Sequence, residues 1–381
     1  MENTQEKHYN LISAEIIADS LNQFGQRLTT FKLIFPRIIL AEFNTHRMFN
    51  RNSASSRAIP FEKMVKMVKE QPFIPIAWQK DHKGMQGTEY HIDNDVILND
   101  NQWLEARDNA IFIAKNLHKA GVTKQLCNRL LEPFMYHTVL VTATEWENFF
   151  ELRCPKYHKP YETIYYRSKK DLLNSLPDVD AKIIKKESTN IDWLQRNKGA
   201  AEIHIMDLAE KMWDVYNESK PKQLKVGEWH IPFGEFNTPQ KENNYIDWEA
   251  KYIHNKITKE KNRLPFVEEL VQESIKTRVK IATARCARIS YETLGDNPEI
   301  NYEKDIKLHD DLLAMKHMSP FEHCAVVMND EDYYSHIKTT KVESFTIFND
   351  DDIYVDGPIS FKDCGWSRNL KGFKQYREII E

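Results

Sequence analysis

The stretch FNTHRMFNRNSASSRAIP, residues 43–60, contains several basic residues and serines but no carboxylate. An ordinary surface mixes charges of both signs. Hydroxyl donors, backbone N–H groups and a guanidinium hold a phosphate dianion well, and Ser55, Ser56 and Arg57 supply them on consecutive residues. The stretch predicts a local anion site or, on charge alone equally well, a solvated basic loop. Its basic residues are His46, Arg47, Arg51 and Arg57.

The composition limits the class of protein. The chain has 381 residues, of which 41% are hydrophobic and 11% aromatic, so it can bury a core within one large domain or two smaller ones. The net charge of −4 argues against a chain that binds nucleic acid through its overall charge. An anion site in this chain would therefore be local.

The ends and the cysteines predict a cytoplasmic protein without membrane partners. MENTQEKHYN at the start lacks the apolar core of a signal peptide. The most apolar stretch, FKLIFPRIILAEF, is interrupted by Pro36 and Arg37 and is too short to cross a bilayer. The five cysteines are scattered without a CxxC pair, which predicts free thiols and no metal site.

Hydrophobic periodicity predicts a mixed α/β chain. Residues 27–36 alternate and residues 135–144 are β-branched, so both read as strands. Residues 43–60 would then lie on a helix end and the loop after it, and Thr144 would cap a helix. Residues 154–198 are basic and rich in tyrosine and predict an insertion. Helices are predicted over 37–46, 60–70, 101–121, 123–132, 144–153, 199–216, 248–260, 264–282 and 304–317.

The opening stretch resembles the signature R-H-R-x-x-S-x-N-x-x-S-x-R of the flavin-dependent thymidylate synthases. This chain reads Thr45-His46-Arg47 and then Asn50, Asn52, Ser55 and Arg57 at the same spacing and without a gap. Thr45 replaces the first arginine and Asn50 the first serine of that signature. Ser53 stands where the family usually has an acidic residue.

Further blocks resemble the same family in the same order. GVTKQLCNRLLEP (121–133) resembles its G-x-A-R-x-x-L-P helix, and NFFELR (148–153) resembles N-F-x-x-L-R. AAEIHIMDLA (200–209) resembles H-A-Q-x-E-I-x-x-L-A, with alanine and glutamate replacing the histidine and glutamine.

Two other blocks stand out of order. HMSPFEH (317–323) resembles the family's H-x-S-P-F-E-H turn, and ARCARISYE (284–292) resembles its ARVSY segment. Both normally precede the signature, so the resemblance implies a circular permutation, which is tolerated when termini lie close together.

The resemblance implies an α/β (α+β) fold with a central, mostly antiparallel sheet flanked by helices. Residues 1–153 and 199–381 would form one domain, with 276–330 holding the block usually found at the N-terminus. Residues 154–198 would be inserted into it. The family's sites lie between subunits, so a homotetramer is expected.

The implied activity is reductive methylation of dUMP to dTMP, with FAD as cofactor and methylenetetrahydrofolate and NADPH as co-substrates. Arg153 would be the catalytic residue, because a guanidinium facing the pyrimidine stabilises its developing charge. The implied substrate-binding residues are Ser55, Ser56, Arg57, Arg129 and Arg153. The implied flavin-binding residues are His46, Arg47, Asn52, Ser53, Thr144, Asn148, His317, Ser319 and His323.

Other readings of these residues stay open. Arg129 and Arg153, each taken alone, could be arginines that reach past apolar neighbours to solvent. His317 and His323 could be structural, as could Trp229 and His230, which could instead stack on folate. Gln375 and Arg377 could refill the space left by the missing signature arginine, or they could belong to an exposed basic tail.

Three rival functions also remain. The chain could be a flavoenzyme that hydroxymethylates, or that modifies another pyrimidine nucleotide, because Thr45 and Ser53 replace charged residues of the family. It could bind a nucleotide without catalysis. The basic, tyrosine-rich segment 156–170 gives slight support to nucleic-acid binding, which would depend on salt.

Overall fold

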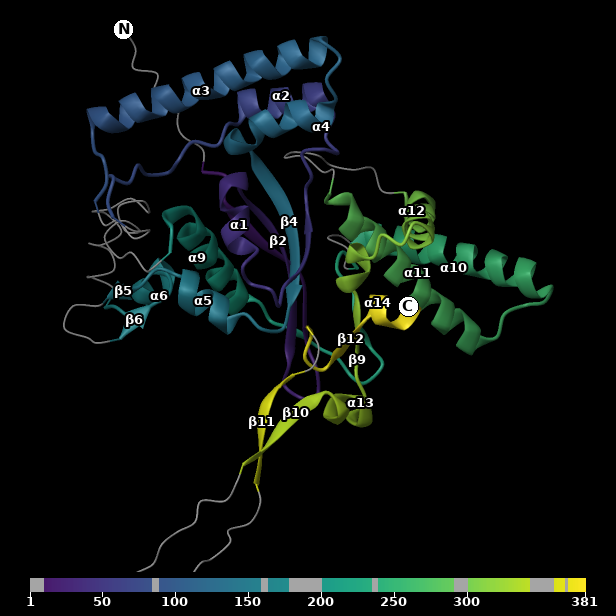
Figure 1. Cartoon of the computed structure of the whole chain (residues 1–381). Helices are drawn as coiled ribbons and strands as arrows, with labels where there is room; N and C mark the ends of the chain where they lie inside the picture. The colour runs from purple at the N-terminus through teal and green to yellow at the C-terminus, as the bar shows by residue number, and fades with distance from the viewer. Residues whose placement is uncertain are drawn as a thin grey trace, which may run out of the picture.

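The computed structural model describes residues 10–83, 89–158, 164–177, 201–234, 239–290, 301–342, 360–366 and 369–381. At its centre lies a five-stranded sheet with the strand order β3-β4-β2-β1-β7 (Figure 1). Neighbouring strands are antiparallel except β1 and β7, which are parallel. The strands are β1 (Ser13–Leu21), β2 (Arg27–Pro36), β3 (Asn50–Ser53), β4 (Tyr136–Ala143) and β7 (Lys222–Gln223).

The main core lies on one face of this sheet. Strand β2 has the predicted alternation, and Phe31, Leu33 and Phe35 are fully buried on that face. Strand β4 pairs Val139 with Leu33 and Val141 with Phe31, which extends the apolar surface. All eight residues of β4 are buried, including the polar side chains of His137, Thr138 and Thr142.

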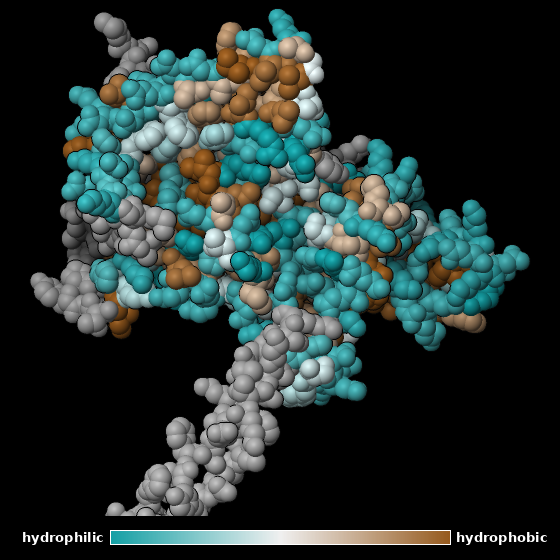
Figure 2. Space-filling model, in the orientation of Figure 1, coloured by the Kyte–Doolittle hydropathy of each residue, from teal (hydrophilic) through white to brown (hydrophobic). Residues whose placement is uncertain are grey.

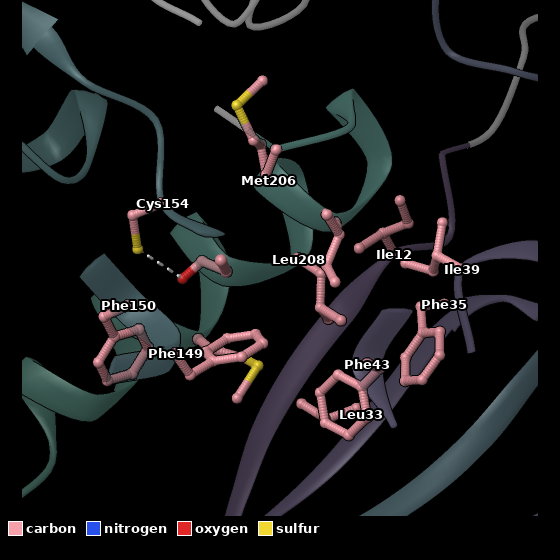
Figure 3. Close-up of a cluster of buried hydrophobic side chains, with 14 of the residues drawn as sticks. Ile12, Leu33, Phe35, Ile39, Phe43, Phe149, Phe150, Cys154, Met206 and Leu208 are labelled. Carbon is pink, nitrogen blue, oxygen red and sulfur yellow. Dashed lines mark hydrogen bonds between the residues drawn. The ribbon is translucent and has the colours of Figure 1, made fainter. Parts of the chain in front are cut away.

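Two helices cover this face, as Figure 1 shows. Their aromatic and aliphatic side chains, among them Phe149, Phe150 and Leu208, meet Phe43 and the strand residues in one buried cluster (Figure 3). Cys154 closes the cluster and donates its thiol to the carbonyl of Ala209 at 3.6 Å. The two helices are α5 (Glu147–Arg153) and α9 (Ile203–Glu218).

The C-terminal part of the chain covers the opposite face. Leu140 of β4 packs against Cys286 and Ile289, and Leu28 of β2 packs in a cluster with Phe373. A three-stranded antiparallel sheet, β12-β9-β8, lies beside these residues. The elements here are β8 (Trp229–His230), α11 (Val267–Arg288), α12 (Tyr302–Ala314), η3 (Ser319–Glu322), β9 (Ala325–Val327), β12 (Phe373–Gln375) and α14 (Tyr376–Ile380). The predicted fold class, a mixed α/β chain with a central, mostly antiparallel sheet flanked by helices, is therefore confirmed.

A helical layer lies over one end of the sheet (Figure 1). It has its own core, in which Phe61 and Met64 meet Ile111 and Leu131. Its elements are α2 (Phe61–Glu70), α3 (Asn94–Lys119), α4 (Lys124–Cys127) and the 3-10 helix η2 (Asn128–Phe134).

The described part of the predicted insertion packs against the main core. Arg167 donates to both carboxylate oxygens of Glu147 on α5, at 2.9 and 2.6 Å, and Tyr157 donates to Glu210 on α9 at 3.0 Å. The remaining elements of the chain are η1 (Arg37–Ile39), α1 (Leu40–Phe43), β5 (Tyr157–His158), β6 (Tyr165–Tyr166), α6 (Lys169–Asn174), α10 (Pro239–Lys261), α13 (Asp330–Ser335), β10 (Ile337–Val342) and β11 (Ser360–Trp366).

Several local predictions were wrong. Residues 50–53 form an edge strand of the central sheet instead of a loop. Thr144 is not the N-cap of α5, which begins after Trp146; its hydroxyl instead accepts from the backbone of Lys371 at 3.1 Å. The helix expected over 123–132 is a short α-helix followed by a 3-10 turn that contains Pro133.

The C-terminal residues are not an exposed basic tail. Strand β12 pairs antiparallel with β9, and Gln375 at its end is buried. Arg377 on α14 forms an ion pair of 2.7 Å with Glu322. The tail is therefore an integral part of the second sheet.

Candidate functional site

Arg153 is held at one end of the signature stretch. It ends α5, and its Nε donates to Nε2 of His46 at 3.2 Å. Its Nη2 donates to the Thr45 hydroxyl at 3.3 Å, and Nη1 lies 3.8 Å from the Glu42 carboxylate. These contacts fix the guanidinium plane from three directions while part of the side chain stays accessible.

His46 acts in this arrangement as a neutral acceptor. Its ring is buried and packs edge-on against Phe149, with centroids 4.9 Å apart. Burial, together with the positive charges of Arg153 and Arg51, lowers the pKa of His46 to about 4. Since Nε2 accepts from Arg153, the ring carries its proton on Nδ1 at neutral pH.

The next part of the stretch contacts the 317–323 turn. The side-chain amide of Asn50 donates to the backbone carbonyl of Glu322 at 3.1 Å. Burial lowers the pKa of Arg51, and the nearby Glu322 carboxylate opposes that effect. Glu322 also holds Arg377, so residues from three distant segments meet at this turn.

Two further contacts join the stretch to the C-terminal part. Asn52 is buried, donates to the carbonyl of Cys286 at 3.2 Å and accepts from the Ser319 hydroxyl at 2.9 Å. The backbone N–H of Ser55 donates to the carbonyl of Ser290 at 2.8 Å. Segments that resemble separate motifs of the family are thus adjacent in this structure.

The Ser55–Arg57 turn rests on the helical layer at the other end of β3. The side-chain amide of Asn128 donates to the carbonyl of Ser56 at 2.7 Å and to that of Ile59 at 3.0 Å. The buried Ser56 hydroxyl donates to Glu132. Arg57 directly follows Ser56, and Arg129 directly follows Asn128. Because Ser56 and Asn128 are hydrogen-bonded, the backbones of the two arginines lie close together.

Exposed arginines without acidic partners mark this surface. Within the described ranges, Arg47, Arg57 and Arg129 form no ion pair, and all three are exposed. By contrast, Arg37 in the same region lies 3.9 Å from Glu132. Unpaired guanidinium groups beside a serine-rich turn suit an anionic ligand with several oxygens. A surface hollow of about 380 Å³ is lined in part by Arg37 and Glu132, and by none of these three arginines.

The other predicted residues differ in accessibility. Ser53 is half-buried on β3, and Asn148 and His317 are exposed. His323 is fully buried, and its Nδ1 shares a hydrogen bond of 2.8 Å with the Thr142 hydroxyl. A series of hydrogen bonds continues from there. The hydroxyls of Thr142 and Thr30 lie 2.7 Å apart, and the His230 ring lies 2.8 Å from the Thr30 hydroxyl and 2.8 Å from the Ser20 hydroxyl. His230 thus joins Ser20 of β1 to Thr30 of β2 from one face of the sheet. Of the two roles that the sequence left open for His230, these contacts support the structural one.

The predicted substrate residues fall into two groups within one copy of the chain. Arg153 lies at the His46 end of β3, whereas Ser55, Ser56 and Arg57 follow its other end and neighbour Arg129. No hydrogen bond or ion pair joins the two groups in the described part of the chain. The four residues of β3 span roughly 13 Å of extended chain, which separates the two ends.

Sequence reasoning assigned no role to Glu42, Arg51, Asn128 or Glu132. Glu42 and Arg51 flank His46, and Asn128 and Glu132 hold the Ser56 turn. A usable signal existed only for Arg51, which is an arginine inside the acid-free stretch. The other three become relevant only through their positions in space.

Buried neutral histidines predict that acid destabilises the fold. Burial is the main cause that lowers the pKa of His46 to about 4 and of His137, His230 and His323 to about 3 each. In the unfolded chain these histidines bind protons near pH 6.5, whereas in the folded chain they stay neutral at that pH. The free energy of unfolding therefore falls as the pH drops below that value. Each ring contributes about 1.4 kcal/mol per pH unit at most. Urea unfolding at pH 7.5, 6.0 and 5.0 should show this loss, and a midpoint unchanged at pH 5.0 would contradict it.

Comparisons with known proteins give little. No protein-family model and no curated protein matches the sequence. A crystal structure of the UMP/dUMP methylase PolB from Streptomyces cacaoi bound with 5-Br UMP is 13% identical, with a TM-score of 0.31 over 55% of this chain and 96% of that chain. The same methylase bound with 5-Br dUMP is 11% identical, with a TM-score of 0.31 over 54% and 95%. A likeness at this level carries no inference, so the site is interpreted from its own residues.

A separate finding concerns membranes. Among the described residues, no helix combines the length and the apolar composition needed to span a bilayer.

Proposed function

We propose that this chain is a flavin-dependent thymidylate synthase, a circularly permuted one, that methylates dUMP at C5. Methylenetetrahydrofolate would donate the one-carbon unit, FAD would be the bound cofactor and NADPH the reductant. One observation carries the proposal. The stretch that resembles the family signature contacts the segments that resemble its other motifs: His46 meets Arg153, Asn52 meets Ser319, and Ser55 meets Ser290.

Arg153 has the position and charge that the chemistry needs. C5 of uracil becomes nucleophilic when negative charge on the ring is stabilised. His46, Thr45 and Glu42 hold the guanidinium from its other sides, so it need not reorganise when charge develops. None of the four cysteines whose side chains are described is exposed, so we assign the chemistry to this cation and to no thiolate.

The nucleotide phosphate would bind at Ser55, Arg57 and Arg129. The guanidinium groups of Arg57 and Arg129 form no ion pair with any described residue and therefore offer bidentate donors. The Ser56 hydroxyl donates to Glu132, so in this proposal Ser56 contributes through its backbone or by exchanging that partner.

The remaining accessible residues of the predicted site fit an anionic cofactor. Arg47 is exposed and forms no ion pair in the described part of the chain, and Ser53, Asn148 and His317 are at least partly accessible. We assign FAD to these residues; when bound, it supplies the hydride. Asn52, Ser319, Thr144 and His323 hydrogen-bond within the protein and would shape the wall of that site; their contacts are those with Cys286, Asn52, Lys371 and Thr142, respectively.

We further propose that another copy of the chain completes each pocket, within a homotetramer. The two groups of substrate residues lie at opposite ends of β3, so a single copy does not bring them to one nucleotide. Figure 2 shows hydrophobic side chains gathered over the end of α3 nearest α4, close to the Arg129 segment. The exposed residues in this region are Phe112, Ile113, Leu117, Leu126 and Leu130.

A hydroxymethylating enzyme, or one acting on another pyrimidine nucleotide, is the second candidate. The observation that favours it is the contact between Arg153 and Thr45, because Thr45 stands where the family signature has an arginine. A changed residue beside the catalytic guanidinium alters the space next to the ring.

One experiment separates these functions. The purified chain is examined for a visible flavin spectrum, and the products from dUMP and from dCMP, with methylenetetrahydrofolate and NADPH, are identified by mass. A coloured protein that makes dTMP supports the proposal. A hydroxymethylated product, or turnover of dCMP alone, selects the second candidate. A colourless protein that takes up no FAD refutes both.

Arg57→Ala should weaken dUMP binding about tenfold to a hundredfold. A charge-assisted hydrogen bond contributes about 1.5–3 kcal/mol, and nothing else in the described part neutralises this arginine. Isothermal titration measures the dissociation constant. Lys66→Ala, which removes an exposed cation from α2, is the control and should bind normally. Equal affinities of Arg57→Ala and wild type would remove Arg57 from the phosphate site.

A further inference from the structure

The α10–α11 hairpin carries an apolar stripe that nothing in the described chain covers. Figure 1 shows the two helices extending away from the central sheet. Along α11 the exposed fractions are 72% at Val267, 57% at Val271 and 37% at Ile275, and Leu264 just before the helix is 70% exposed. Residues four apart lie on one face of a helix, so these side chains form a continuous stripe.

The stripe lies opposite the face that binds α10. Glu269 pairs with Lys261, and Glu273 pairs with Lys256 of α10; Thr277 continues this face and is buried. Two residues along a helix are a rotation of about 200°. Val267, Val271 and Ile275 each stand two positions from this inner row and therefore face outward.

The charges beside the stripe are self-complementary. Between residues 267 and 278, three charged side chains pair within the hairpin, namely Glu269, Glu273 and Arg278. Glu268 and Lys276 are exposed and form no ion pair in the described residues. Each directly follows a stripe residue, so both lie on the same flank, eight positions apart.

We propose that two copies of this chain pair through α11, antiparallel, across a two-fold axis near Val271. Such an axis brings Val267 of each copy beside Ile275 of the other, and Glu268 beside Lys276, because an isologous contact repeats each pair twice. The stripe is only about 13 Å long. It buries far less than the roughly 800 Å² per partner of a standard interface, so the contact is a weak, concentration-dependent one. It is independent of the nucleotide site.

Charge reversal tests this pairing without any ligand. In Glu268→Lys, two lysines face each other across the axis, and in Lys276→Glu, two glutamates do. Each variant alone should raise the dissociation constant about tenfold in sedimentation velocity across a concentration series. An equimolar mixture restores both opposite-charge pairs and should recover the wild-type assembly. Both positions are exposed, and circular dichroism confirms that the variants fold.

A cross-link gives the second measurement. Val271→Cys lies at the axis and should form a disulfide-linked dimer under mild oxidation, because the four described native cysteines are buried. Asn255→Cys, on the exposed face of α10, should give no more dimer than wild type. The proposal fails if the single reversals sediment as wild type, if their mixture does not recover, or if the two cysteine variants cross-link alike. A lack of flavin or of thymidylate synthesis would leave these outcomes unaffected.

Discussion

Replacing Arg153 by alanine should lower turnover of dUMP about 100- to 1,000-fold, with a change of less than about tenfold in the dissociation constant of dUMP. Removing one preorganised group that stabilises charge in the transition state typically has an effect of this size on turnover. The ground-state nucleotide is held mainly by its phosphate in this proposal. Single-turnover kinetics and titration with dUMP separate the two quantities.

Arg153→Lys is the informative companion. Lysine keeps the charge but cannot donate to His46 and Thr45 in the same plane, contacts of 3.2 and 3.3 Å in the native chain. We expect turnover to recover only in part. Full activity in both variants would show that Arg153 is an arginine turned to solvent, one of the alternatives that the sequence left open.

Replacing Phe149 by alanine should lower the free energy of unfolding by about 3–5 kcal/mol, as expected for truncating a buried phenylalanine. Its ring lies 5.7 Å from Phe43, 5.6 Å from Phe49 and 4.9 Å from His46, centroid to centroid. The cavity would also free the His46 ring, so the variant links the core to the site. Urea denaturation measures the change in stability.

Leu152→Ala is the matched control on the same helix. Leu152 is 49% exposed, and surface substitutions of this kind usually change stability by no more than about 0.5 kcal/mol. A similar loss in both variants would contradict the assignment of the effect to the packing of Phe149, because alanine has the higher helix propensity in both cases.

The sequence predicted the elements whose pattern is local. Alternation over 27–36 and the helical periodicity over 60–70 both describe the structure well, because burial on one face imposes those periods. Strand β3 was missed, since NRNS is short and polar and becomes a strand only by pairing with β4. Thr144 was predicted to cap a helix, but its hydroxyl accepts a hydrogen bond from the backbone N–H of Lys371, 227 residues later.

The candidate site followed the same division. The acid-free stretch could be found by its composition, and its neighbours could be named from the family resemblance. The accessibility of each residue could not be predicted, because it depends on contacts between segments that are distant in the sequence. Asn52 is enclosed by Cys286 and Ser319, whereas Arg47 remains exposed. The pairing of Arg377 with Glu322 likewise has no local signal.

The second sheet has a consequence for synthesis on the ribosome. Its strands β8, β9 and β12 come from residues 229–230, 325–327 and 373–375, so its middle strand gains its last partner only after residue 375 has been synthesised. Until then, the edge of β9 that pairs with β12 and the apolar cluster that Phe373 joins stay open on the nascent chain. We therefore expect the emerging polypeptide to be a client of chaperones that shield such edges until β12 has been made.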